Sequence, residues 1–378
     1  MIMKKRILIF SIVIVVFLIS IMAMNYYTSN AKTFTQDGVT YALTLDGNSV
    51  NSFPSKGMYR VDVTCNNAMG RWLYEDWNLA VENITGNNAT CNIDFVTISK
   101  TYLNNYIIDL TGQDQGKGQV VNENGYRYEG KNPNNYVWFN NELWRIIGVF
   151  DSASHGQSGK NLVKIIRNES IGQLMWNNIE SSDWSQASLK NLLNGAYLNA
   201  QNGTDSEYCW SDVDIPGNCD YTIIGINSTS RTMIANANWP LGGSNIADTP
   251  DNLYINERGT NVYGSNATEW TGKIGIMYAS DYGYSVLASS CARTTTLNTY
   301  NSSTCAGQSW IYSLGEEWTL TPKSNHEYMV YYLSYFNGFV DRSYPNDGKT
   351  VRPTLYLDSS IYVIDGNGSQ SDPYIIGM

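Results

Sequence analysis

The segment Tyr136-Val-Trp-Phe-Asn-Asn-Glu-Leu-Trp-Arg-Ile-Ile-Gly-Val-Phe150 decides the fold of the larger part of this chain. It holds two runs of apolar, mainly aromatic and β-branched residues on either side of Asn140-Asn141. Asparagine tolerates the left-handed backbone that a tight hairpin turn requires. The segment therefore predicts two antiparallel strands, over residues 136–139 and 143–150, joined by a short turn.

More strands are predicted toward the C-terminus, at residues 162–167, 274–278, 328–336, 339–340, 351–357, 361–364 and 374–376. Asn337-Gly338 favours a second hairpin with a type I′ turn. Leucines at helical spacing predict a helix over 186–199, capped by Ser185. The polar segment 201–270 is predicted to be a long irregular loop, which in a compact domain usually has a function or an internal brace. This order of elements predicts a mixed α+β domain over 120–378.

A smaller domain is predicted before it, because three segments between residues 32 and 97 alternate apolar and polar residues at the period of a strand. We expect a small all-β spacer module over 32–97. Residues 98–119 are predicted to form a helix that ends at Gly112 and a flexible linker.

The N-terminal 31 residues predict a membrane anchor. Three basic residues, 4–6, precede an uncharged and mainly apolar run over residues 7–24 that is about as long as a bilayer is thick. Ser29-Asn30-Ala31 leaves a second interpretation open, in which the segment is a signal peptide cleaved after Ala31. The basic residues place the N-terminus in the cytoplasm and the rest of the chain outside. The expected location is thus the cell membrane, with a single pass through residues 7–24.

Six cysteines fall into three separated pairs: Cys65 with Cys91, Cys209 with Cys219, and Cys291 with Cys305. Six cysteines allow about 15 pairings, and the grouping favours the sequential one, with free buried thiols as the alternative. Disulfides need an oxidising compartment, which agrees with the expected location. No pair has the close spacing of a zinc site, so no metal and no cofactor are predicted.

The chain is acidic, with 24 Lys and Arg against 34 Asp and Glu. Such a surface disfavours nucleic acid and anionic lipid as partners. Tyrosine and tryptophan are abundant, at 28 and 11 residues, and suit both strands and binding surfaces.

Three segments resemble a known family: Phe139–Gly148, Trp318–Pro322, and Val351–Leu357 with the ending Asp365–Tyr374. Together they resemble an uncharacterised surface-domain family of Gram-positive bacteria, related to the C-type-lectin-like and sulfatase-modifying-factor folds. The resemblance covers about residues 120–376. It implies a C-type-lectin-like domain with paired terminal strands, whose long irregular loop region forms the ligand surface.

Enzymes of the sulfatase-modifying group use a cysteine pair near the C-terminal end of the fold for copper-dependent oxidation. In this chain the last cysteine, Cys305, precedes Trp318–Pro322, so the oxidase activity is not expected. The sequence also lacks the nucleophile, metalloprotease and phosphate-binding motifs of common enzymes. We therefore predict no catalytic residues and no enzymatic activity.

Polar and aromatic residues of two segments are the candidate ligand contacts: Trp239, Asn245, Asp248, Trp270, Glu317 and Trp318. The first four belong to the 201–270 segment and would converge on a groove. The hypothesis favoured by the sequence is a membrane-anchored surface protein that presents a lectin-like domain to a glycan or protein ligand. The alternatives are a structural or assembly component of the cell envelope and, less favoured, an oxidase of the sulfatase-modifying type.

Overall fold

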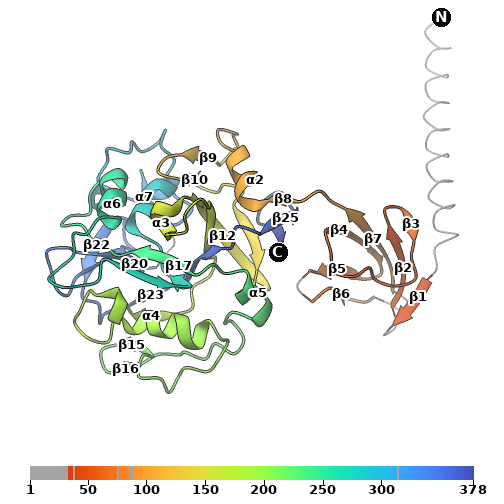
Figure 1. The fold of residues 1–378 in the computed structure, drawn as a ribbon, viewed down its shortest axis with the longest axis horizontal. Helices are drawn as coiled ribbons and strands as arrows, with labels where there is room; N and C mark the ends of the chain where they lie inside the picture. The colour runs from red at the N-terminus through yellow and green to blue at the C-terminus, as the bar shows by residue number, and fades with distance from the viewer. Residues whose placement is uncertain (1–32, 37–38, 75, 86–88, 313–314) are drawn as a thin grey trace, which may run out of the picture. The chain divides into compact units, whose positions relative to one another are not determined.

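A computed structural model describes residues 33–36, 39–74, 76–85, 89–312 and 315–378 of the chain (Figure 1). These residues divide after Ser99 into two compact units, called unit 1 (up to Ser99) and unit 2 (Lys100–Met378). The predicted anchor at residues 7–24 lies outside the described residues. Within them, no helix is long and apolar enough to cross a membrane.

Unit 1 is a small β domain. Its main sheet has the order β1-β2-β7-β4, with β3 added to β2, and β5 and β6 form a separate hairpin. The strands are β1 (Thr33–Gln36), β2 (Val39–Leu45), β3 (Asn48–Ser49), β4 (Tyr59–Asn66), β5 (Met69–Leu73), β6 (Asn78–Glu82) and β7 (Ala89–Thr97). Strands β2 and β7 run parallel, and β4 runs antiparallel to β7.

An aromatic core and one disulfide hold unit 1 together. Trp72 and Phe95 meet edge to face, with ring centroids 5.0 Å apart, beside the aliphatic side chains of Leu43 and Ile93. The bridge Cys65–Cys91 joins residues that stand directly opposite each other on β4 and β7. A domain this small gains from such a bridge, because its core alone is marginal.

Unit 2 is built on a ten-stranded sheet whose main path is β19-β24-β13-β12-β11-β26-β25-β8, with β10 pairing β12 and β9. Its strands are β8 (Thr101–Tyr102), β9 (Gly118–Asn122), β10 (Tyr126–Gly130), β11 (Tyr136–Phe139), β12 (Glu142–Phe150), β13 (Leu162–Arg167), β19 (Ile274–Gly275), β24 (Thr354–Leu357), β25 (Tyr362–Asp365) and β26 (Tyr374–Gly377). The predicted hairpin is β11 and β12, and both turn residues, Asn140 and Asn141, have φ of 59°. The hairpin prediction is thus confirmed.

A second, five-stranded sheet has the order β14-β23-β20-β21-β22. Its strands are β14 (Gln173–Met175), β20 (Glu317–Pro322), β21 (Val330–Leu333), β22 (Val340–Ser343) and β23 (Gly348–Thr350). The remaining strands form two two-stranded sheets: β15 (Trp210–Asp212) with β16 (Ile215–Pro216), and β17 (Ala237–Pro240) with β18 (Glu269–Gly272).

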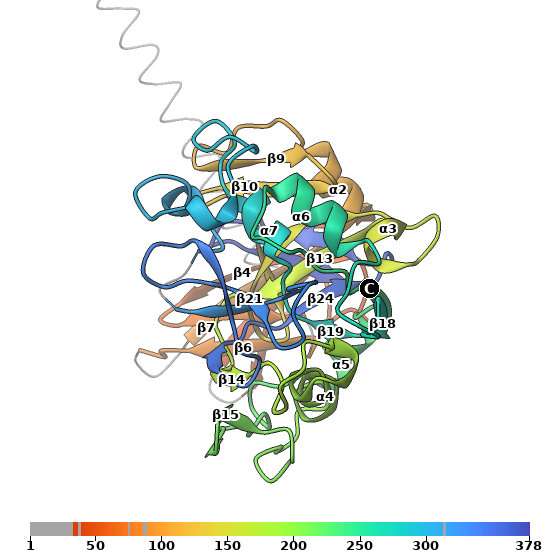
Figure 2. The ribbon, with the colours of Figure 1, turned by 90° about the vertical axis from the view of Figure 1, so that its left-hand side faces the viewer.

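The helices of unit 2 are short: α2 (Leu103–Asp109), α3 (Ser152–His155), α4 (Ser188–Leu192), α5 (Ser228–Thr232), α6 (Pro250–Glu257) and α7 (Ala279–Ser285). Single turns are η1 (Trp184–Gln186), η2 (Leu193–Tyr197), η3 (Leu297–Thr299) and η4 (Ala306–Gln308). Helices α6 and α7 lie side by side in both views of the ribbon (Figures 1 and 2).

The predicted α+β class is wrong. Among the described residues 37% are in strands and 15% in helices, so this part of the chain is mostly β. The helix predicted over 186–199 shows why. It is broken into the turn η1, the five-residue helix α4 and the π-turn η2. Asn194 interrupts it, because its side chain bonds the backbone of Ile274 on β19, donating to the carbonyl and accepting from the N–H.

Two other expectations need correction. The helix predicted within residues 98–119 is present as α2, but the segment does not form a separate linker. It belongs to unit 2, and the Gly112 N–H donates to Val120 O on β9. The segment 201–270 is not one irregular loop, because β15 to β18, α5 and α6 lie within it. The Cys209–Cys219 bridge braces its first part, with 6.0 Å between the Cα atoms.

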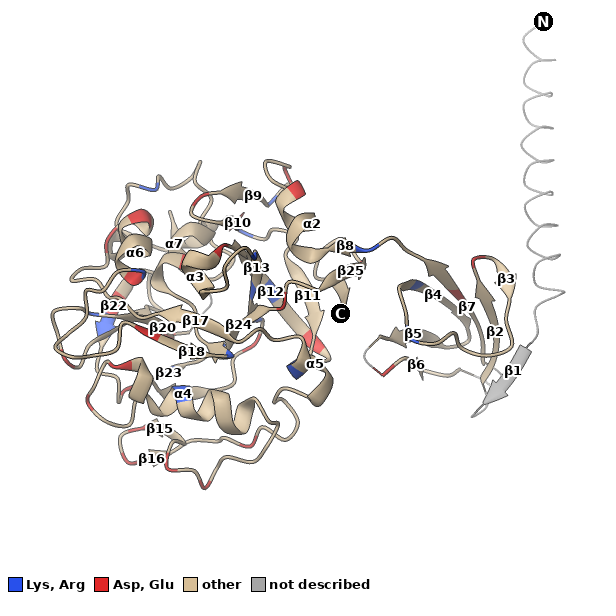
Figure 3. Cartoon of the chain, in the orientation of Figure 1, with Lys and Arg blue, Asp and Glu red and all other residues tan. Residues whose placement is uncertain are grey.

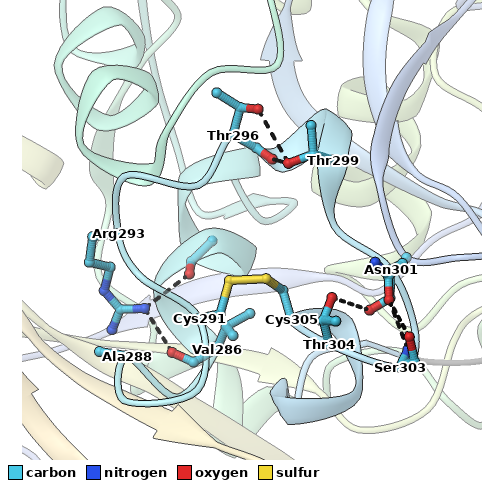
Figure 4. Close-up of a disulfide and its surroundings, with 12 residues drawn as sticks. Val286, Ala288, Cys291, Arg293, Thr296, Thr299, Asn301, Ser303, Thr304 and Cys305 are labelled. Atoms are coloured by element: carbon cyan, nitrogen blue, oxygen red, sulfur yellow. Dashed lines mark hydrogen bonds between the residues drawn. A yellow bond between two sulfur atoms is a disulfide. The ribbon is translucent and has the colours of Figure 1, made fainter.

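The third bridge, Cys291–Cys305, closes a loop next to α7 (Figure 4). Arg293 fixes the same loop, because its Nη1 donates to the carbonyl oxygens of Val286 at 2.7 Å and Gly283 at 3.3 Å. All three sequential disulfides predicted from the sequence are present in the structure.

A buried ionic cluster lies at the centre of unit 2. Asp281 on α7 accepts hydrogen bonds from Lys164 Nζ at 2.6 Å and Arg127 Nη1 at 3.0 Å, and these three side chains are at most 1% exposed. Burial alone would favour the protonated acid, but the two cations outweigh it and lower the pKa of Asp281 to about 2. The Lys164 ammonium also lies over the Tyr278 ring, 4.3 Å from its centroid.

Candidate functional site

A cleft of about 590 Å³ opens on unit 2 beside β21 and β22. Four chain segments supply its lining, which consists of Asn245, Ile246, Ala247, Asn298, Lys323, His326, Met329, Tyr331, Phe339, Val340, Asp341 and Arg342. Its size lies within the range of ligand sites, roughly 300–1,000 Å³. The lining mixes amide and charged groups with aromatic and aliphatic side chains, as sites for small polar ligands do.

The β21–β22 hairpin forms one side of the cleft. Tyr331 stands opposite Arg342 in its register, and Val330 stands opposite Ser343. The Tyr331 hydroxyl donates to Ser244 O at 3.1 Å, and burial raises the pKa of this phenol. The hydroxyl therefore stays protonated and ties the hairpin to the facing segment.

The facing wall is the segment from Ser244 to Asp248. Ser324 Oγ donates to Asn245 Oδ1 at 2.7 Å, which holds this amide against the chain that follows β20. Gly243 permits the approach, because a Cβ at this position would stand 2.4 Å from Pro322 O. A residue with a side chain would push the wall away from the sheet.

Asp248 connects this wall of the cleft to the first turn of α6. Its carboxylate accepts the Thr249 N–H at 2.7 Å and the Asn252 side-chain amide at 3.1 Å, in the first turn of the helix. Its carbonyl accepts the N–H of Leu297 at 3.1 Å, which places Asn298 on the cleft. Asp248 thus positions two segments of the site.

Basic side chains outnumber acidic ones among the described residues that line the cleft. Lys323, His326 and Arg342 are basic, and Asp341 is the one carboxylate. Lys323 Nζ donates to Asn325 Oδ1 at 2.5 Å, and Arg342 Nη1 to Asp341 Oδ1 at 3.1 Å. Burial and then the charge of Arg342 lower the pKa of Lys323, so the two cations act on each other.

His326 adds a buried polar atom. Its Nδ1 has no hydrogen-bond partner among the described residues, although it is shielded from solvent. The ring packs edge to face on Tyr328, with centroids 4.8 Å apart, so its orientation is fixed. A buried nitrogen without a partner is costly unless a ligand or water completes it.

The six residues predicted as ligand contacts do not gather in one place. Asn245 lines the cleft, and Asp248 supports its wall. Trp239 and Trp270 face each other across β17 and β18. Trp239 is completely buried with its Nε1 on Gly272 O, and half-buried Trp270 packs on Trp184. The tryptophans therefore hold the two-stranded sheet of β17 and β18 together and do not frame a groove with Asn245.

Glu317 and Trp318 are also core residues, each 1% exposed, because β20 is covered on both faces. Glu317 accepts two hydrogen bonds from Arg352, at 2.8 and 2.7 Å, and Trp318 Nε1 donates to Leu174 O. Neither side chain is available to a ligand. Arg352 and Glu317 thus form an ion pair inside this core.

The sequence did not identify Lys323, His326, Tyr331 or Arg342 as site residues. The one feature of the sequence that pointed to these residues was the hairpin predicted over 328–340. Such a hairpin brings the residues that precede and follow it to one edge of the sheet. Nothing in the local sequence indicates that the segment around Asn245 packs against this edge.

No three His, Cys, Asp or Glu side chains of the described ranges lie close enough together to hold a metal ion. The sulfurs of Cys291 and Cys305 are joined to each other and are nearly buried.

No protein-family model, curated protein or solved structure matches this chain. The family resemblance drawn from the sequence therefore stays a prediction.

Proposed function

We propose that this protein is an extracytoplasmic binding protein whose unit 2 takes a saccharide into the cleft beside β21 and β22. The observation that carries the proposal is the lining of that cleft, in which the amides of Asn245 and Asn298 stand near the apolar surfaces of Met329 and Phe339. Sugars present hydroxyl groups at their edges and C–H groups on their faces. Side-chain amides can donate to and accept from the hydroxyls, and apolar side chains can pack on the C–H faces.

Binding without cleavage is the simpler expectation for this lining. Glycoside hydrolysis generally uses two carboxylates that flank the bond to be broken. Asp341 is the single carboxylate among the described lining residues, and its Oδ1 accepts from Arg342.

The proposed location outside the cell is supported by the three disulfides, which form where the environment is oxidising. We further propose that residues 7–24 keep the chain on the membrane. Extraction of membranes from cells that express the chain tests this: an integral anchor resists alkaline carbonate. Release into the wash, or a secreted product that begins after Ala31, would show that the segment does not anchor the mature protein.

A saccharide panel and titration calorimetry with the purified 378-residue chain test the binding function. Asn298→Ala removes an amide from the cleft and should weaken binding about 3- to 10-fold, the value of one hydrogen bond. Asn105→Ala on α2 is the matched control, because this asparagine is exposed and outside the cleft. A panel without any binding saccharide, or equal affinities for the two variants, contradicts the proposal.

One observation favours a second candidate, the docking of another envelope protein. Phe336 is 77% exposed and Tyr335 43% exposed in the loop between β21 and β22, where the two rings pack edge to face. Exposed aromatic side chains are frequent anchors of protein interfaces. Cross-linking in intact cells should yield a defined partner that Phe336→Ser abolishes; unchanged cross-links would remove this candidate.

A further inference from the structure

The charge of the cleft differs from that of the chain. The chain has a formal net charge of −10, and charged positions are sparse along both units (Figure 3). The described cleft residues nevertheless include two cations, Lys323 and Arg342, against the single carboxylate of Asp341. A local excess of basic groups on an acidic protein is a selective feature, because the net charge of the chain repels the same anions that the cleft attracts.

The two cations keep free hydrogen-bonding capacity toward the cleft. Lys323 has no carboxylate within salt-bridge distance among the described residues, and Asn325 takes one of its three protons. Arg342 uses Nη1 for Asp341, while Nε and Nη2 have no partner in the described part of the chain. Arg342 is also 57% exposed, so these donors are accessible.

Two like charges close to each other are unfavourable unless an anion lies between them. Lys323 precedes β21 and Arg342 lies on β22, and the fold brings both to the lining of the same cleft.

We infer that the ligand of this cleft is an acidic saccharide, whose carboxylate or phosphate group binds between Lys323 and Arg342. The inference rests on the saccharide-binding function proposed above. The planar guanidinium of Arg342 supplies paired donors for two oxygens of the acid, and the Lys323 ammonium supplies a compact charge. Asp341 orients the guanidinium, and Asn245 and Asn298 remain for hydroxyl groups of the sugar.

Matched pairs of acidic and neutral saccharides test the inference on the full chain by calorimetry. The probes are trigalacturonate and its methyl ester, sialyllactose and lactose, and glucose 6-phosphate and glucose. At least one acidic member should bind about tenfold or more tightly than its neutral partner, and this preference should shrink at high salt. The pair that shows the preference identifies the acid as carboxylate or phosphate.

Two variants connect the preference to the residues. Arg342→Gln should lower the affinity for the acidic member about tenfold and leave the neutral member unchanged. Lys160→Gln is the control, because it removes the same charge from an exposed position outside the cleft. Circular dichroism melting confirms that both variants are folded.

The outcomes separate the two proposals. Equal binding of acidic and neutral members, or an equal effect of Arg342→Gln on both, overturns the acidic ligand and leaves the saccharide function standing. Absence of binding by every probe and by the wider panel overturns the saccharide function, and the acidic ligand with it.

Discussion

Replacement of Asp281 by asparagine tests whether the buried ionic cluster is needed for the stability of unit 2. The substitution keeps the shape of the side chain but removes its negative charge. Lys164 and Arg127 then remain as two cations, each at most 1% exposed, without the carboxylate that accepts from both. Loss of one partner from a buried ion pair costs about 3–5 kcal/mol, because the remaining charge is neither solvated nor neutralised.

That cost corresponds to a fall in melting temperature of roughly 6–15 °C for a domain of this size. Near-ultraviolet circular dichroism during thermal and urea unfolding measures it. Asp341→Asn is the control, because the same substitution affects a pair that is 57% and 37% exposed and should cost under about 1 kcal/mol.

An unfolding free energy of Asp281→Asn within about 1 kcal/mol of the wild-type value, the size of one surface ion pair, would refute this role of the cluster. Such a result would mean that Lys164 loses its proton at neutral pH at little cost. Burial lowers the pKa of Lys164 to about 8, with Asp281 opposing the shift, so the ammonium depends on this carboxylate. A second replacement, Lys164→Met in the Asp281→Asn background, should recover part of the stability.

Three further predictions follow from the structure. The pKa of Asp281 is lower in the folded state, about 2, than in the unfolded chain, so its contribution is complete above pH ~4 and is lost as the pH falls toward 2. The unfolding free energy of the wild type should fall by about 2–3 kcal/mol more than that of Asp281→Asn over this interval in urea titrations. Joint replacement of Cys291 and Cys305 by alanine should cost about 3 kcal/mol, because the bridge spans 14 positions; a loss under 1 kcal/mol would contradict this. Gly243→Ala should cost about 1–3 kcal/mol and weaken saccharide binding, because the new methyl group would meet Pro322 O; unchanged binding would show that the wall tolerates displacement.

Local signals in the sequence predicted local structure well. The turn at Asn140-Asn141 formed as expected, because asparagine adopts the left-handed region that both turn positions need. Asn337-Gly338 also predicted a hairpin turn, and β21 and β22 form a hairpin at this position. Its strands, however, end at Leu333 and resume at Val340, so the expected two-residue turn is wrong. The wider loop is closed by the Ser334 N–H donating to Phe339 O, which brings Phe339 to the cleft.

The helix over 186–199 failed for a different reason. Its leucines have helical spacing and are buried, but contacts with distant parts of the chain determine the hydrogen-bond pattern of its turns. Asn194 bonds to the backbone of β19, eighty positions away in the sequence, and the chain widens into a π-turn. Periodicity within a short window contains no information about such a partner.

The site was the least predictable part. Asn245 was identified because it lies in a polar segment. Lys323 and Arg342 line the same cleft because of the strand order of the second sheet, which the sequence does not give. Trp239 and Glu317 were chosen for their chemistry and are buried, because aromatic and acidic side chains also fill the core when a neighbour pairs with them. Burial is decided by long-range packing, which a single sequence does not display.

The parallel pairing of β2 and β7 in unit 1 has a mechanical consequence. Tension between Val39, at the start of β2, and Thr97, at the end of β7, pulls the two strands in opposite directions along their length. All the hydrogen bonds between them then share the load and must break together, instead of opening one after another. The Cys65–Cys91 bridge also prevents the chain between these cysteines from extending, even after β4 separates from β7. A pulling force applied between these two ends would therefore meet strong resistance in unit 1.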